Sequence, residues 1–283
     1  MPNIEYSLFR VKFIKPSQAS LFTENLNPRE FLLQAIDDKP SAELRTGYTW
    51  HIGNLSYFSL SSGYFAIGRT TSSTVEKFDE VSGNFVEEEL EESPYTHCVF
   101  DSEIGIIGIA KKPNLSPYTT TIANNLEKLL SSVNVIKFSH ITVQIRPIPD
   151  PDGFLKAISE AYRVFRFSAT FRGPNPFDAD AFFQKPLSVY LSSANGNKGK
   201  ATISGDDLNR DVLVEVTRSS AATGNEASAR IIKARNQKAV TINLKGDPVK
   251  RKYDEENHNP QFILADLLRT YHRIRHHDGN SDQ

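Results

Sequence analysis

Two consecutive strand–turn–helix patterns between His140 and Asn195 constrain the fold of this chain more than any other feature. Each begins with a strand-like segment, continues through a proline-containing turn, and ends in a helical segment that starts near an aspartate. Prolines end the strands, and the aspartates, 28 residues apart, can cap the free amides of the helices that follow. Such units predict a mixed sheet with helices packed on it. The segments are Ile141–Arg146, Pro147–Asp152 and Phe154–Tyr162, then Val164–Arg172, Gly173–Phe177 and Asp178–Lys185, with a helix break at Pro186.

The first half of the chain has a different pattern. Short strands rich in aromatic and β-branched residues alternate with turn signals such as Gly53-Asn54 and Ser62-Gly63. A length of 283 residues accommodates two domains of ordinary size. The sequence therefore predicts an α+β protein with a strand-rich N-terminal domain over residues 1–136. A C-terminal α+β domain over residues 137–278 and a disordered tail over residues 279–283 complete the prediction.

Helix boundaries are clearest where a cap residue precedes a proline or an apolar stripe. Asn27-Pro28 and Asn259-Pro260 each place an N-cap before a proline at the first helical position. Thr119–Ser132 carries an amphipathic apolar stripe. A further helix is expected from Asp206-Asp207, with Gly224 as its C-terminal cap, although Val212–Val216 is also compatible with a strand.

Basic charge collects in the C-terminal half. Residues 1–150 carry 13 Lys and Arg against 18 Asp and Glu, a net charge of −5, whereas residues 151–283 carry 20 against 16, a net charge of +4. Ala227–Arg235 and Lys238–Lys245 predict a hairpin, and Lys250–Lys252 follows in an expected loop. A basic segment within a nearly neutral protein is typical of a polyanion-binding surface. The candidate nucleic-acid-binding residues are Lys198, Lys200, Lys233, Arg235, Lys238, Lys245, Lys250, Arg251 and Lys252.

An acidic run, Phe85–Glu92, stands in contrast to this segment. We interpret it as a solvated loop or sheet edge, or alternatively as an acidic surface that competes with nucleic acid. Trp50 lies among several tyrosines and phenylalanines that are expected to fill the core, although such a cluster can also stack bases.

Several classes of protein are disfavoured. The longest apolar run, Ile104–Ala110, is far shorter than the roughly 20 residues of a membrane helix, so no membrane insertion is expected. The N-terminus lacks the apolar core of a signal peptide. A single cysteine, Cys98, cannot form an internal disulfide, which favours a cytoplasmic location.

No catalytic signature is recognisable, and no cofactor, metal site or catalytic residue is assigned. His97 and Cys98 are adjacent in a predicted strand, where neighbouring side chains point to opposite faces. His272 and His276 have metal-ligand spacing but lie where a helix ends, and complementing its dipole is the simpler role. A toxin-like metal-dependent nuclease remains an alternative, with Asp207, Asp211 and Glu215 as its candidate carboxylates.

One resemblance covers roughly residues 45–145. The order Tyr48-Thr-Trp-His-Ile-Gly, Ser56–Arg69, Phe100–Ile107 and Ser116-Pro-Tyr-Thr-Thr resembles the RexA-like phage-exclusion proteins. The resemblance lies in hydrophobic patterning, so no functional residue is carried over. It implies a cytoplasmic, dimeric DNA-binding sensor in bacterial phage defence, with a possible partner protein from the same operon.

Charge and resemblance together favour a nucleic-acid-binding protein without sequence preference, with DNA preferred over RNA. A homodimer is expected, and an enzyme is not favoured. Two alternatives remain open: the nuclease, and a non-catalytic interaction subunit whose basic face meets an acidic protein or its own acidic run across a dimer.

Overall fold

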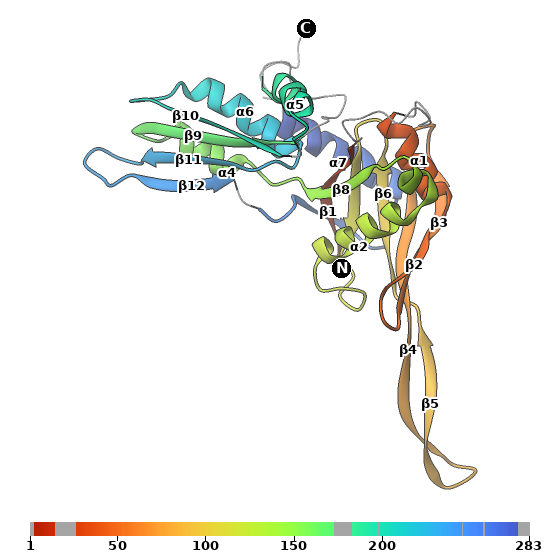
Figure 1. Cartoon of the computed structure of the whole chain (residues 1–283). Helices are drawn as coiled ribbons and strands as arrows, with labels where there is room; N and C mark the ends of the chain where they lie inside the picture. The colour runs from red at the N-terminus through yellow and green to blue at the C-terminus, as the bar shows by residue number, and fades with distance from the viewer. Residues whose placement is uncertain are drawn as a thin grey trace.

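Two antiparallel sheets and the helices packed on them form the protein, which confirms the predicted α+β class (Figure 1). The computed structural model describes residues 3–14, 27–172, 183–196, 198–244, 246–256 and 258–276. The predicted C-terminal tail lies outside these residues, and so does Asp180, the second of the two aspartates that were expected to cap helices. Among the described helices, none combines the length and the hydropathy that crossing a membrane requires.

The first sheet is built around its N-terminal strand, β1, which pairs with three others. One edge of β1 pairs with β7; the other pairs first with β13 and then with β8. From β7 the sheet continues through β6, β4 and β3 to β2, and β5 pairs with the outer half of β4. The strands are β1 (Asn3–Ile14), β2 (Ser41–Arg45), β3 (Tyr48–Tyr57), β4 (Ser62–Asp79), β5 (Asn84–Glu92), β6 (Tyr95–Asp101), β7 (Ile106–Ala110), β8 (Thr142–Pro147) and β13 (Lys250–Asp254).

Strand alternation gives this sheet two buried faces. One face, which includes Trp50 and Cys98, packs against helices α1 (Pro28–Asp37), α2 (Thr119–Ser132) and α3 (Asn134–Phe138). Trp50 and Phe65 are buried in the core as expected, whereas Tyr57 of the same aromatic cluster is exposed. The predicted start of α1 is confirmed: Asn27 forms a capping box with Glu30 ahead of a proline in the first turn.

The C-terminal helix α7 (Pro260–Arg275) covers the opposite face of the first sheet, and its predicted N-cap, Asn259, is confirmed. Leu267 of α7 is fully buried against Gly108 of β7. Arg10 of β1, also fully buried, donates a 2.8 Å hydrogen bond to the Tyr271 hydroxyl. The last helix is therefore held to the first strand, although they lie at opposite ends of the sequence.

The second sheet has the order β10-β9-β11-β12 and is antiparallel throughout. The mixed sheet predicted from the sequence is therefore wrong. The predicted hairpin is confirmed as β11 and β12. Helices α4 and α6 bury one face of the sheet, and α5 contacts β9. The elements are α4 (Asp152–Ser159), β9 (Arg163–Phe171), α5 (Gln184–Ser193), β10 (Gly199–Ser204), α6 (Arg210–Ala222), β11 (Ala227–Ile232) and β12 (Val240–Leu244).

The two strand–turn–helix units do not share a sheet, contrary to the prediction. The first strand, β8, pairs with β1 in the first sheet, and only the second, β9, belongs to the second sheet. The basic run Lys250–Lys252 is also in the first sheet, as part of strand β13 rather than a loop. The boundary predicted near residue 136 therefore does not coincide with the division between the sheets, and separate folding of two domains stays a prediction.

Three predictions about helix ends are wrong. Asp152 does not cap α4: it is the first residue of that helix, Pro151 occupies the N-cap position, and no side chain caps the helix. The helix expected at Asp206-Asp207 begins at Arg210, because Asn209 caps it by accepting hydrogen bonds from the amides of residues 211 and 212. Pro186 does not break a helix but lies in the first turn of α5, where its missing N–H costs no hydrogen bond.

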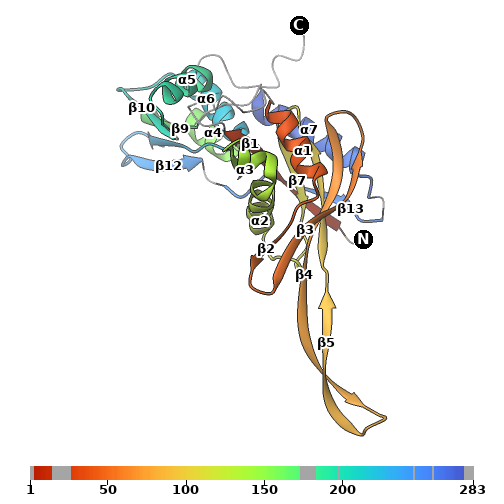
Figure 2. The same ribbon diagram turned by 45° about the vertical axis from the view of Figure 1, so that its right-hand side comes forward.

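A long two-stranded arm leaves the body of the first sheet. Its strands are the outer half of β4, from Thr71 to Asp79, and the whole of β5. In both views the arm extends away from the second sheet, and its tip is the most distant part of the described chain from that sheet (Figures 1 and 2). The acidic run is thus an exposed edge strand, in agreement with the first of its two interpretations.

Candidate nucleic-acid interface

The structure divides the nine predicted binding residues among three places. Lys198 and Lys200 lie at the start of β10, near the first sheet. Lys233, Arg235 and Lys238 lie in the β11–β12 turn, at the opposite end of the second sheet. The remaining described residues, Lys250, Arg251 and Lys252, belong to β13 of the first sheet, and Lys245 lies outside the described residues.

Several of these cations are already engaged within the chain. Lys198 pairs with Glu226 at 3.4 Å, and Lys250 pairs with Glu5 at 3.7 Å. Arg251 donates from its Nε to the Thr270 hydroxyl at 3.0 Å, and so helps to hold α7. Because of these contacts and their position, the β13 residues do not extend the second-sheet surface.

The sheet register adds two arginines that the sequence analysis missed. Arg166 of β9 lies directly opposite Arg230 of β11, on the face that α4 and α6 leave uncovered. Both side chains are exposed, and Arg166 donates to the Ser204 hydroxyl at 3.3 Å. Like charges directly opposite each other destabilise a sheet. An anion placed between the two guanidinium groups would relieve that repulsion.

We call six residues on this face and its distal turn the basic sheet face. None of them forms an ion pair with a carboxylate in the described part of the chain, although other lysines and arginines there do. All six side chains are exposed. The basic sheet face comprises Arg166, Lys200, Arg230, Lys233, Arg235 and Lys238.

Between its cations the face carries short polar side chains. The Ser168 and Thr202 hydroxyls are hydrogen-bonded at 2.9 Å across β9 and β10, and Ser228 lies opposite Ser168 on β11. Hydroxyl groups can donate to phosphate and sugar oxygens. The face therefore offers hydrogen bonding as well as positive charge.

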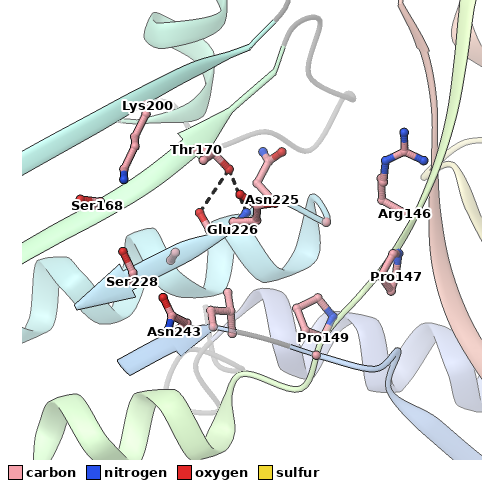
Figure 3. Close-up of a pocket in the computed structure, with 14 residues that line it drawn as sticks. Arg146, Pro147, Pro149, Ser168, Thr170, Lys200, Asn225, Glu226, Ser228 and Asn243 are labelled. Carbon is pink, nitrogen blue, oxygen red and sulfur yellow. Dashed lines mark hydrogen bonds between the residues drawn. The ribbon is translucent and has the colours of Figure 1, made fainter. Parts of the chain in front are cut away.

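A cavity of about 550 Å³ lies at the inner end of the face, between the second sheet and the segment that follows β8 (Figure 3). Lys200 and Thr170 lie on one side of it, and Pro147 and Pro149 on the other. Gly224, at the end of α6, has a φ of +64°, and a Cβ there would come within 3.0 Å of the Arg146 Cβ. The absence of a side chain lets α6 end close to β8. Ser168, Asn225, Glu226, Ser228, Asn243 and Gly246 complete the polar part of the lining.

Two residues of this lining, Thr170 and Asn225, are held by hydrogen bonds to other residues. The Thr170 hydroxyl accepts from the Glu226 amide at 2.9 Å, and the Asn225 amide donates to Gln184 at 3.2 Å. Asn225 is 4% exposed, and its Oδ1 atom has no hydrogen-bond partner. An unsatisfied buried acceptor costs about 1–3 kcal/mol.

The candidate carboxylates of the nuclease alternative do not gather into a cluster. Asp207 accepts from the backbone amide of Val164 at 3.0 Å and pairs with Arg210, whereas Asp211 and Glu215 lie on the exposed side of α6. Within the described ranges, no three His, Cys, Asp or Glu side chains are grouped to hold a metal ion. The geometry lends this alternative no support.

Cys98 and the C-terminal histidines lie apart from the basic sheet face. Cys98 is fully buried, and burial raises the pKa of its thiol. The His272 and His276 rings stack at 6.3 Å near the end of α7. Arg218 of α6 donates to the carbonyls of Arg273 and of two later residues, which neutralises part of the negative end of that helix.

A histidine–tyrosine cluster beside the N-terminus of α7 was also missed from the sequence. The Tyr64 hydroxyl is hydrogen-bonded to His97 Nδ1 at 2.6 Å, and the Tyr6 hydroxyl to His258 Nε2 at 2.8 Å. The two imidazole rings lie 5.1 Å apart. Burial lowers the pKa of both histidines, and their mutual repulsion lowers that of His97 further. Their sequence positions, 161 residues apart, carry no shared signal.

Comparison with known families assigns the chain to one of them. Residues 30–269 match the family described as a domain of unknown function, DUF4747. The chain belongs to this family. The match begins within α1 and ends within α7, so it covers the second sheet with the basic sheet face and every strand of the first sheet except β1. Among curated proteins, none matches the sequence.

Proposed function

We propose that this protein binds nucleic acid, with DNA preferred over RNA, through the basic sheet face and without sequence preference. The observation that supports this most strongly is the facing pair Arg166 and Arg230, which have no carboxylate partner and stand next to three further cations of the distal turn. Phosphate groups are well suited to bridge neighbouring guanidinium groups, because their oxygens accept several hydrogen bonds at once.

Contact with the backbone, rather than with base edges, follows from the residue types. Lysines and arginines in an exposed turn, together with hydroxyls on a flat sheet, reach phosphates and sugars, which carry no sequence information. Each neutralised phosphate releases counterions. In a plot of log affinity against log salt concentration, six contacts correspond to a slope of about −5.4 for duplex DNA and about −4.2 for a single strand.

The decisive experiment compares two double charge reversals of the full chain by fluorescence anisotropy with labelled DNA. Arg166→Glu/Arg230→Glu changes the basic sheet face. Lys250→Glu/Lys252→Glu is the matched control, because it changes the net charge by the same amount on β13 of the first sheet. The first variant should lose most of its affinity and reduce the salt slope by about 2. The control should bind like the wild type.

Equal effects of the two variants would show that net charge, rather than this face, determines binding. The absence of any binding by the wild type at low salt would refute the proposed function. The same titration with RNA of equal length tests the preference for DNA.

The wider biological role is part of the proposal. A sensor or component of bacterial phage defence, located in the cytoplasm, is what the RexA-like resemblance implies, and the unpaired Cys98 suits a reducing compartment. The nuclease alternative predicts cleavage of DNA or RNA in the presence of magnesium or manganese. We expect intact substrate after prolonged incubation with either ion.

A further inference from the structure

The arm that projects from the first sheet has two unlike faces. Residues 71–92, which are the outer half of β4, the turn and β5, form what we call the acidic arm. One face carries Glu76, Glu87, Glu89 and Glu91 and ends in the aromatic pair Phe78 and Phe85 near the tip, whose rings are 5.2 Å apart. The other face contains Lys77, which pairs with Glu88 at 3.4 Å. The first face thus concentrates negative charge with no cation among its paired positions.

The acidic arm lacks what normally stabilises a hairpin of its length. Nine residue pairs extend it by about 30 Å. Glu76 and Glu87 lie directly opposite each other, and such like-charge pairs are destabilising. Phe85 is 80% exposed and Val81 is 96% exposed. A two-stranded ribbon without a covered face is marginally stable in water, so these features together indicate a surface that is covered by a partner.

We propose that the acidic arm docks on the basic sheet face of a second copy of this chain. The two surfaces are complementary in charge: one has four carboxylates with no paired cation among them, and the other has six cations with no carboxylate partner in the described chain. The apolar tip would be covered in the same contact.

The spacing of the charges also agrees. Glu87 and Glu91 are four residues apart on one strand, which corresponds to about 14 Å. On the basic sheet face, Lys200 lies opposite Thr170, which is four residues along β9 from Arg166. Lys200 is therefore also about 14 Å along the strand direction from the facing pair Arg166 and Arg230. One strand of the arm can therefore meet both groups of cations at once.

The contact has to form between two molecules. The arm and the second sheet extend in different directions from the body, and in both views the tip lies far from the sheet of its own chain (Figures 1 and 2). Each copy offers one arm and one basic sheet face, so a pair can exchange arms. Docking would exclude nucleic acid from the face; this competition, although not the docking, rests on the proposed function.

Sedimentation velocity of the full chain, without nucleic acid, tests the docking. The wild type should associate at 50 mM salt and dissociate at 500 mM salt. Glu87→Lys/Glu89→Lys and Arg166→Glu/Arg230→Glu should each be monomeric when alone. A mixture of the two variants should associate again, because the reversed arm of one matches the reversed face of the other. This rescue separates docking from misfolding.

Glu88→Lys/Glu92→Lys, on the opposite face of the arm, is the matched control and should associate like the wild type. A monomeric wild type at low salt and micromolar concentration would overturn the proposal and indicate a different basic partner for the arm. Failure of the mixture to associate, with both variants folded by circular dichroism, would overturn it as well. Loss of DNA binding by a variant that still associates would concern the proposed function alone.

Discussion

The contact between Gly108 and Leu267 allows a direct test of how the last helix is placed. A Cβ atom at position 108 would lie 2.4 Å from the Leu267 Cδ1 atom and 3.0 Å from the Val99 Cγ2 atom. Real carbon atoms do not approach this closely, so Gly108→Ala has to push α7 away from β7 or force Leu267 into another rotamer. Overpacking of this kind costs about 1–3 kcal/mol in the free energy of unfolding.

Removing the opposing side chain has a separate cost. Leu267 is fully buried, and Leu267→Ala should lower the free energy of unfolding by about 3–5 kcal/mol through the lost burial and the cavity that remains. In the double variant, the new methyl group enters the space that Leu267 Cδ1 has left. The clash then disappears, and the double variant should be less destabilised than the sum of the single ones by about 1–2 kcal/mol.

Urea unfolding of the full chain, followed by circular dichroism, measures these differences. Leu129→Ala, in α2 on the other side of the first sheet, is the control. Combined with Gly108→Ala, it should be additive. Additive behaviour of Gly108→Ala with Leu267→Ala would refute the packing of α7 on β7. Such a result would favour the sequence-based division, in which this helix belongs to a separate C-terminal domain.

Further predictions concern other buried groups. Tyr271→Phe leaves the buried Arg10 guanidinium with one hydrogen bond fewer, and should lower the free energy of unfolding by about 1.5–3 kcal/mol, measured in the same urea assay. His97 and His258 have pKa values below the ordinary 6.5 in the folded chain, so the unfolded chain binds more protons and stability should fall as the pH drops below about 6.5; thermal unfolding between pH 7.5 and 5.5 checks this, and an unchanged melting temperature contradicts it. Cys98 should react with a thiol reagent only after denaturation, because its thiol is fully buried and its pKa is raised; rapid modification of the native chain would show that β6 is not enclosed.

Features that depend on a few neighbouring residues could be predicted from the sequence. Asn27-Pro28 and Asn259-Pro260 identify helix starts because the capping groups lie within one turn of the amides that they satisfy. The apolar stripe of α2 and the β11–β12 hairpin were also recognised, since each depends on a local period or a short turn. The α+β class follows from such local signals.

The partners of each strand were decided only by tertiary structure. β8 and β9 have similar local patterns, but β8 pairs with β1, some 130 residues earlier, while β9 enters the second sheet. Local sequence does not specify which distant edge a strand meets, because that choice depends on burying both faces of the completed sheet. The basic sheet face arises in the same way: Arg166 and Arg230 are 64 residues apart, and only the register of β9 with β11 brings their charges together. Lys250–Lys252, close to the hairpin in sequence, was drawn away from it by its pairing with β1.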